Sequence, residues 1–340
     1  MAVSIRKLQH RAVSFVLAVC ATAAGAFSTV VATVCLLLPA PAATQTYPQK
    51  PVRIVTAGVG GGSDFVSRVI AQAISGPLGQ QVIVDNRPSG VIPGEVASRA
   101  APDGYTLLVA SNGLWIEANL RESTPYDAAK DFVPVTLVGR SPAFLVVHPA
   151  LPVKSVKELI ALARSRPGDL NYASGAVGGV DHLAGELFKS MAHVNIVRVG
   201  YKTGAVRTAD LIGGHVQLSF GTGGTVAPYV KAGKLRALAA TSAQRSVVFP
   251  ELPTISEAGV PGYEAVQMLG VFVPARTPSA IVTRLNHEMT TATRQPEVTA
   301  RLLGSGVEAV GSSPVEFARV IKADMAKWSA LIKQTGMRAE

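Results

Sequence analysis

The sequence predicts an α/β fold built on a mostly parallel sheet with helices on its faces. From Lys50 onward, short apolar runs alternate with segments whose apolar residues recur every three or four positions, as they do along helices. Strands separated by helices indicate parallel pairing, because each helix carries the chain back across the sheet. Glycine and proline residues between the segments indicate the turns.

The first elements after Lys50 are three strands and two helices. Strands are expected at "VRIVTA" (52–57), "QVIVDN" (81–86) and "YTLLVAS" (105–111), which are rich in β-branched and aliphatic residues. Helical patterns cover residues 64–76 and 92–100. This order is that of successive strand-helix-strand units.

The middle of the chain continues the same alternation. Helices are expected at about 156–166 and 180–191. The strands expected around them are "FLVVHP" (144–149), "LNYAS" (170–174), "NIVRVGY" (195–201), "VQLSFG" (216–221) and "LRALAAT" (235–241).

The final helix begins at a capping box, Ser313-Pro314-Val315-Glu316, with proline at its first position. Its apolar residues, which include Phe317 and Trp328, share one face. Such a stripe is typical of core packing, so we assign Trp328 to the core.

Two apolar segments, 135–149 and 263–275, are candidates for chain crossings between two domains. If the middle third of the chain forms one domain and the two ends form the other, a cleft lies between them. Clefts between domains are common ligand sites.

The first 43 residues have the composition of a secretory leader. Arg6, Lys7 and Arg11 precede an apolar stretch that has no charged side chain before Lys50. Small residues suit cleavage after Ala42 or Ala43, so the protein is expected to be exported. An uncleaved amino-terminal anchor is the alternative, because the apolar run is long enough to cross a bilayer.

Composition excludes several function classes. Cys20 and Cys35 both lie in the leader, so the mature chain is expected to contain no disulfide and no thiolate site. The histidines are scattered singly, so no metal site is expected. The net charge of +10 comes mostly from single basic residues without interleaved aromatic residues, so no nucleic-acid partner is expected.

The stretch "VRIVTAGVGGGSDFVSRVI" (52–70) places bare backbone between a strand and a helix. The first N–H groups of a helix have no intrahelical partner, and the helix dipole attracts negative charge there. Gly60, Gly61, Gly62, Ser63 and the start of the following helix are therefore expected to form an anion cradle. A tight turn without a ligand is the alternative.

Two enzymatic alternatives start from the same glycine-rich segments. Gly58 and Gly60 open like a dinucleotide fingerprint, with Asp85 at the end of the next strand, but Ser63 occupies the third glycine position. Hydrolysis is suggested by Asp181 beside His182, but adjacent residues on a helix point in different directions and no G-x-S-x-G elbow is present. We expect no catalysis and no cofactor.

Long motifs make the chain resemble the extracytoplasmic solute receptors of tripartite tricarboxylate transporters, often called Bug receptors. The resemblance covers nearly all of the mature chain. Its motifs include "YPQKPVRIV", "VDNRPSG", "AAPDGYTLLVAS", "PYDAAKDFVPVTLV", "LPVKSVKELIALARSRPGDLNYAS", "HLAGELFKSMA", "AGKLRALAATSAQRS" and "LPTISEAGVPGYEA".

The resemblance implies a two-lobed periplasmic binding protein, type II-like, that closes on a small ligand. The first lobe would comprise 44–142 plus 264–340, and the second 143–263. It also implies a periplasmic monomer that binds a small carboxylate and delivers it to membrane subunits of a tripartite transporter. An exported sensor or binding protein without a transporter is the alternative.

The resemblance also implies where the ligand binds. In the loop between the first strand and the first helix, Gly60, Gly61, Ser63 and Asp64 match the family pattern, whereas Thr56, Ala57 and Val59 depart from it. The expected ligand-binding residues lie in that loop and at further strand ends: Val59, Gly60, Gly61, Ser63, Asp64, Ser111, Asn112, Ser174, Gly175, Gly178, Asp181, His182, Tyr201, Gly221 and Thr222.

Two further departures bear on ligand size. Related receptors often have Asp near Gly221 and Trp near Met268, so a wider and less polar pocket is expected. Such a pocket would suit a bulkier carboxylate, for example an aromatic one, better than a small amino dicarboxylate.

Overall fold

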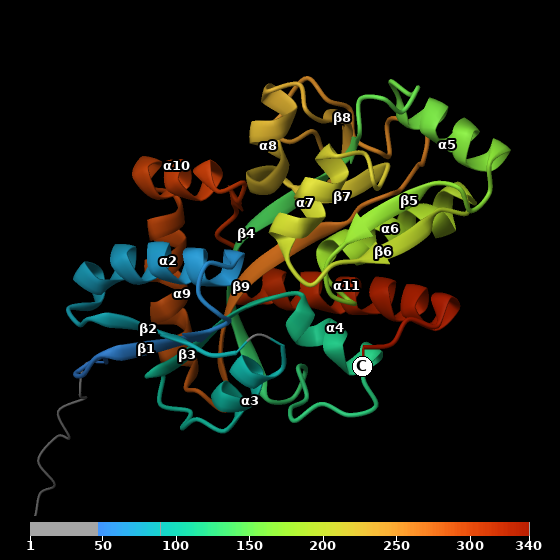
Figure 1. The fold of residues 1–340 in the computed structure, drawn as a ribbon. Helices are drawn as coiled ribbons and strands as arrows, with labels where there is room; N and C mark the ends of the chain where they lie inside the picture. Colours follow the sequence, from blue (N-terminus) through green and yellow to red (C-terminus); the bar gives the residue numbers. More distant parts are fainter. Residues whose placement is uncertain (1–46, 89, 340) are drawn as a thin grey trace, which may run out of the picture. The chain divides into compact units, whose positions relative to one another are not determined.

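The computed structural model describes residues 47–88 and 90–339, which form a mixed β-sheet with helices packed against it (Figure 1). This confirms the predicted α/β class. The expected leader, with Cys20 and Cys35, lies outside the described residues. Within the described part of the chain, no helix combines the length and the apolar character needed to cross a bilayer.

The strands belong to one sheet in the order β2-β1-β3-β9-β4-β7-β5-β6, with β8 and β10 also paired to β4. Their bounds are β1 Val52–Thr56, β2 Val82–Asn86, β3 Thr106–Ser111, β4 Phe132–Val147, β5 Asn171–Ser174, β6 Val197–Gly200, β7 Leu218–Thr222, β8 Arg236–Ala240, β9 Val266–Pro274 and β10 Glu308–Ala309.

The parallel pairs lie away from the two long strands. β1 pairs in parallel with β2 and β3, and β5 with β6 and β7. The pairs that involve β4 or β9 are antiparallel. The sheet is therefore mixed, because the long strands β4 and β9 are antiparallel to the strands beside them.

β4 connects the two groups of parallel strands. Its first part, Phe132–Pro142, pairs with β9, and its last part, Ala143–Val147, pairs with β7. The segments expected to cross between domains, 135–149 and 263–275, overlap these two long strands, β4 and β9.

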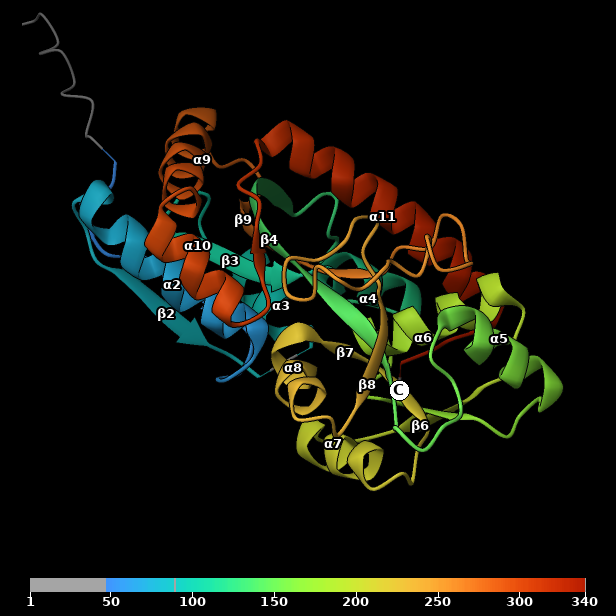
Figure 2. The same ribbon diagram turned by 90° about the horizontal axis from the view of Figure 1, so that it is seen from above.

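The helices include those expected at 64–76, 92–100, 156–166 and 180–191, and the final one expected to begin at the capping box Ser313–Glu316. Their bounds are α2 Gly62–Leu78, α3 Ile92–Ser98, α4 Gly113–Leu120, α5 Val156–Ser165, α6 Val180–Ala192, α7 Gly204–Ile212, α8 Gly223–Lys231, α9 Ser279–Thr293, α10 Pro296–Gly304 and α11 Pro314–Thr335. α2, α9 and α10 pack together, as Figure 2 shows. No range was predicted from the sequence for α4, α7, α8, α9 or α10.

α11 begins at the predicted capping box and packs on α4. The Ser313 hydroxyl accepts from the Glu316 N–H (3.2 Å), and the Glu316 carboxylate accepts from the Ser313 N–H (2.9 Å). Trp328 is buried in the core, as predicted. The buried Asp324 accepts from Trp328 Nε1 (2.8 Å) and from Trp115 Nε1 on α4 (2.9 Å), so one carboxylate joins the two helices.

Candidate functional site

Two adjoining cavities open at the carboxyl ends of β1 and β3. The smaller has a volume of about 290 Å³ and the larger about 750 Å³. They adjoin because both are lined by Gly90, Ser111, Gly113, Glu117 and Gln267.

The start of α2 lines the smaller cavity. Gly61, Gly62 and Ser63 face it, directly after β1. The first intrahelical bond runs from the Phe65 N–H to the Gly61 carbonyl (3.0 Å), so the N–H groups of Gly62 and Ser63 precede it. The expected cradle residues Gly61 and Ser63 therefore lie at a cavity, at the positive end of a 17-residue helix.

Gly60 and Asp64 hold the loop in shape. The Gly60 N–H donates to Asp64 Oδ2 (2.9 Å), and Asp64 Oδ1 accepts from Asn86 Nδ2 (2.9 Å) and Arg68. Burial opposes ionisation of Asp64, but these hydrogen bonds outweigh it and hold its pKa below the ordinary value. Gly60 has φ 85°, which favours glycine. Val59 is 77% exposed and lines neither cavity.

The start of α4 lies between the two cavities. Ser111 lines both, and Asn112 lines the larger one. The Asn112 carbonyl accepts the first helical bonds, from the N–H groups of Trp115 (3.3 Å) and Ile116 (3.1 Å). The N–H groups of Gly113 and Leu114 therefore precede the helical bonds, and this helix start is the second at the cavities.

The start of α6 is the third helix start at the site. Gly178, Gly179 and Val180 line the larger cavity. Gly178 has φ 80°, and a Cβ there would come within 2.3 Å of Leu120 Cδ1 at the end of α4. Only glycine fits this approach of the α6 start to the end of α4.

Three of the expected ligand-binding residues, Gly175, Asp181 and His182, form hydrogen bonds in and next to the turn that begins α6. Asp181 accepts from the Gly175 N–H (2.7 Å) and from Arg207. His182 Nδ1 accepts from the Gly178 N–H (3.1 Å). Burial, helped by the charge of Arg198, lowers the pKa of His182 to about 4, so the imidazole is neutral near pH 7 and can accept this bond.

The charged side chains at the larger cavity were not predicted from the sequence. The larger cavity is lined by Glu117, Arg121, Arg198 and Arg338. Glu117 pairs with Arg121 (2.6 Å), one turn apart on α4. Arg198 donates through Nε to the buried Ser174 hydroxyl (2.7 Å) and through Nη2 to the Gly175 carbonyl (2.7 Å). Ser174 and Gly175 thereby orient Arg198.

Other expected residues lie elsewhere. The Tyr201 hydroxyl donates to Asp210 Oδ2 (2.9 Å), and Thr222 Oγ1 lies 3.2 Å from Thr225 Oγ1. Neither they nor Gly221 lines the two cavities. A Cβ at Gly221 would come within 2.3 Å of Val226, and Met268 belongs to the core. The expected wider and less polar pocket, which rested on Gly221 and Met268, has no basis in this site.

The arrangement suits an anion held by main-chain donors and guanidinium groups. Three helix starts bring N–H groups with no helical partner to adjoining cavities, and the cation Arg198 faces the same space. Among the described residues, no group of three or more His, Cys, Asp or Glu side chains is placed to hold a metal ion.

The family follows from a comparison with known proteins. Residues 66–337 match the model of the tripartite tricarboxylate transporter family receptor. The chain belongs to this receptor family. Its relatives are solute-binding receptors and not enzymes, and the predicted family resemblance is confirmed.

Several receptors of known sequence or structure are similar along most of their length. Protein BugT of Bordetella pertussis is 34% identical over 304 residues, which cover 88% of this chain and 93% of BugT. The solved structure of an R. palustris protein with adipate is 37% identical, with a TM-score of 0.76 and coverage of 86% of this chain and 99% of that one. MatC from Rhodopseudomonas palustris with bound malate is 28% identical, with a TM-score of 0.72 and coverage of 84% and 100%.

Proposed function

We propose that this receptor binds a small carboxylate in the adjoining cavities and delivers it, as a monomer, to the membrane subunits of a tripartite tricarboxylate-type transporter. The observation that carries the proposal is the meeting of three helix starts at one pair of cavities. Carboxylates in two similar structures, adipate and malate, support the ligand class.

The proposed mechanism is closure of two lobes on the ligand. β1 and β3, before α2 and α4, belong to the predicted first lobe, whereas β5, before α6, belongs to the predicted second lobe. A ligand that contacts all three helix starts gains contacts when the lobes close, and so favours the closed form. The closed form is then the one that the membrane subunits recognise.

Export to the periplasm is part of the proposal. The basic and apolar residues before Ala43 support a cleaved leader. A neighbouring structure named as the periplasmic binding protein BugD, 28% identical, supports the compartment. Amino-terminal sequencing of the protein recovered from the periplasmic fraction should start at residue 43 or 44, and a start at Met1 would contradict cleavage.

Calorimetry on the exported protein tests carboxylate binding. The panel contains mono-, di- and tricarboxylates, with uncharged amides of the same carbon skeletons as controls. We expect at least one carboxylate to bind and its amide not to bind, because helix starts attract negative charge. Absence of binding by the whole panel would overturn the proposed function.

Gly61→Val tests the role of the α2 start. Gly61 has φ −83°, which valine adopts, and a Cβ there meets only the Gly58 carbonyl oxygen, at 3.5 Å. The side chain therefore enters the cavity without straining the loop, and we expect carboxylate affinity to fall about 10-fold or more. Gly304→Val, at an open position that lines neither cavity, is the control. Equal affinities of the two variants would contradict the cradle.

A further inference from the structure

The larger cavity contains an excess of positive charge that the proposed cradle at α2 does not use. Its lining includes three arginines and one glutamate. Glu117 is paired with Arg121, which leaves Arg198 and Arg338. Within residues 47–88 and 90–339, no carboxylate oxygen lies within 4.0 Å of either guanidinium group. The cavity can therefore receive negative charge from a ligand.

The orientation of Arg198 is fixed by the protein. Its Nε and Nη2 donate to Ser174 and Gly175, both at 2.7 Å. Two of the three guanidinium nitrogens are thus held, and Nη1 has no acceptor among the residues that the structure describes. A guanidinium held in this way loses little freedom when it binds a carboxylate.

Arg338 is carried by the carboxy-terminal tail, Gly336–Ala339, which returns from α11 to α4 (Figure 1). Gly336 ends α11 in the left-handed conformation (φ 69°) and turns the chain. The Ala339 N–H then donates to the Leu120 carbonyl at the end of α4 (2.9 Å). Met337 and Ala339 pack on the core, so the tail that carries Arg338 is anchored on both sides of it.

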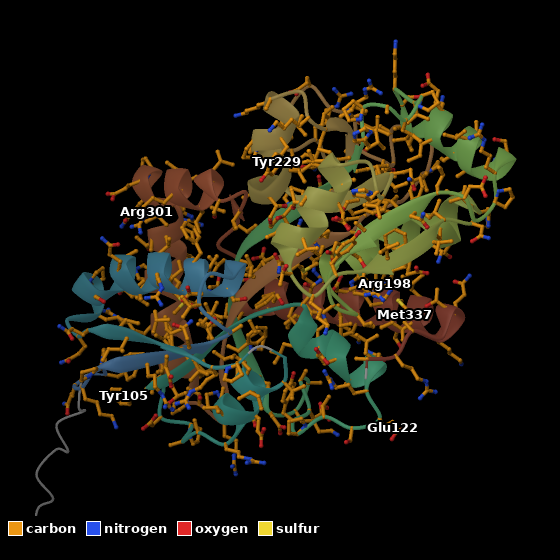
Figure 3. The ribbon with its side chains drawn as sticks, viewed as in Figure 1. Tyr105, Glu122, Arg198, Tyr229, Arg301 and Met337 are labelled. Carbon is orange, nitrogen blue, oxygen red and sulfur yellow. The ribbon has the colours of Figure 1, made fainter. Side chains whose placement is uncertain are left out.

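The two arginines face the same cavity from different elements. Arg198 lies on β6 and Arg338 on the tail, and both line the larger cavity. Figure 3 labels Arg198 and Met337, the residue before Arg338. We propose that Arg198 and Arg338 together bind the second carboxylate of a dicarboxylate ligand, while the α2 start binds the first. The carboxy-terminal tail is then part of the binding site. This inference rests on the proposed function.

The test compares ligands that differ by one carboxylate. The pairs are adipate with hexanoate and succinate with butanoate, measured by calorimetry on the exported protein. We expect the dicarboxylate of at least one pair to bind more tightly than its monocarboxylate. Arg198→Gln and Arg338→Gln should each weaken that dicarboxylate about 10- to 100-fold, the loss typical of a hydrogen bond to a charged group.

The monocarboxylate serves as the control for folding of each variant. It lacks the group that the arginines bind, so its affinity should change less than about threefold, whereas a disturbed fold would weaken both ligands. Arg166→Gln removes an exposed charge on the C-cap of α5 and controls for net charge. Arg338→Lys should retain part of the dicarboxylate preference, because it keeps a positive charge.

The outcomes separate the inference from the proposed function. If the wild-type protein binds neither member of either pair nor any carboxylate of the panel, the proposed function fails and the inference with it. If it binds carboxylates but shows no preference for dicarboxylates, the inference alone is overturned. A preference that survives both Arg198→Gln and Arg338→Gln overturns it as well.

Discussion

His182 directs its imidazole at a backbone amide rather than into the cavity. Nδ1 accepts from the Gly178 N–H, and the side chain is buried. The charged groups around it are Arg198, Glu186, Asp181 and Lys189, and burial is the largest influence on its pKa. Protonation would remove the acceptor and place a positive charge beside Arg198.

This geometry predicts a loss of stability in mild acid. In the unfolded chain, His182 binds a proton when the pH falls below its ordinary pKa of about 6.5. In the folded protein the pKa is about 4, so His182 stays neutral until the pH falls to about 4. The unfolded state therefore binds more protons in this window, and the free energy of unfolding should fall by about 2 kcal/mol as the pH drops from 6.5 to 4.

His182→Asn checks this prediction, because the Asn oxygen can still accept from Gly178 but does not titrate. Denaturant unfolding of both proteins at several pH values measures the difference. The variant should lose less stability than the wild-type protein over the same window. The same slope in both would show that other groups account for the acid sensitivity.

At the scale of elements, Asp324 fixes α4 against α11. Its carboxylate is 3% exposed and accepts from the indole N–H groups of Trp115 and Trp328. α4 carries Gly113 and Glu117 at the cavities, so the position of this helix affects the site. Asp324 is therefore a positioning residue.

Asp324→Asn should cost about 1–3 kcal/mol in the free energy of unfolding, because the amide nitrogen places a donor against one of the two buried indole donors. Carboxylate affinity should also fall as α4 shifts. Thermal or denaturant unfolding and calorimetry measure the two effects. Asp169→Asn at an exposed position is the control, and equal stabilities of the two variants would contradict the role of Asp324.

The elements also show what the sequence could predict. The helix expected at 180–191 is α6, Val180–Ala192, because its apolar period and the glycines before it are strong signals. α4 was missed because it has only eight residues and buries Leu114, Trp115, Ile116 and Leu120 without a clear polar face. The mixed pairing was missed because the direction of β4 and β9 depends on long-range contacts.

The sequence predicted cavity-lining residues at the helix starts, but not the cavity-lining side chains that come from distant segments. Gly61, Ser63, Ser111, Asn112 and Gly178 follow strands, and that position can be read from the sequence. Arg198 stands inside a predicted strand and Arg338 in a short tail. Their approach to one cavity depends on the return of the tail to α4, which no local pattern indicates.

At the scale of the whole molecule, the helix starts at the candidate site follow strands from both groups of parallel strands. The starts of α2 and α4 follow β1 and β3, and the start of α6 follows β5. A single ligand that bridges them should slow amide hydrogen exchange at Ser63, Leu114 and Val180 together. Slower amide exchange confined to α2 and α4 would contradict bridging. The amide exchange rates of β4 and β9 serve as an internal reference.

The loop after β1 does not depend on a ligand for its order. The Asp64 carboxylate accepts from the Gly60 N–H, from Asn86 and from Arg68, so contacts within the protein hold the loop in place. A receptor preorganised in this way spends no binding energy on ordering the loop. The loop should therefore keep this shape whether or not a ligand is bound.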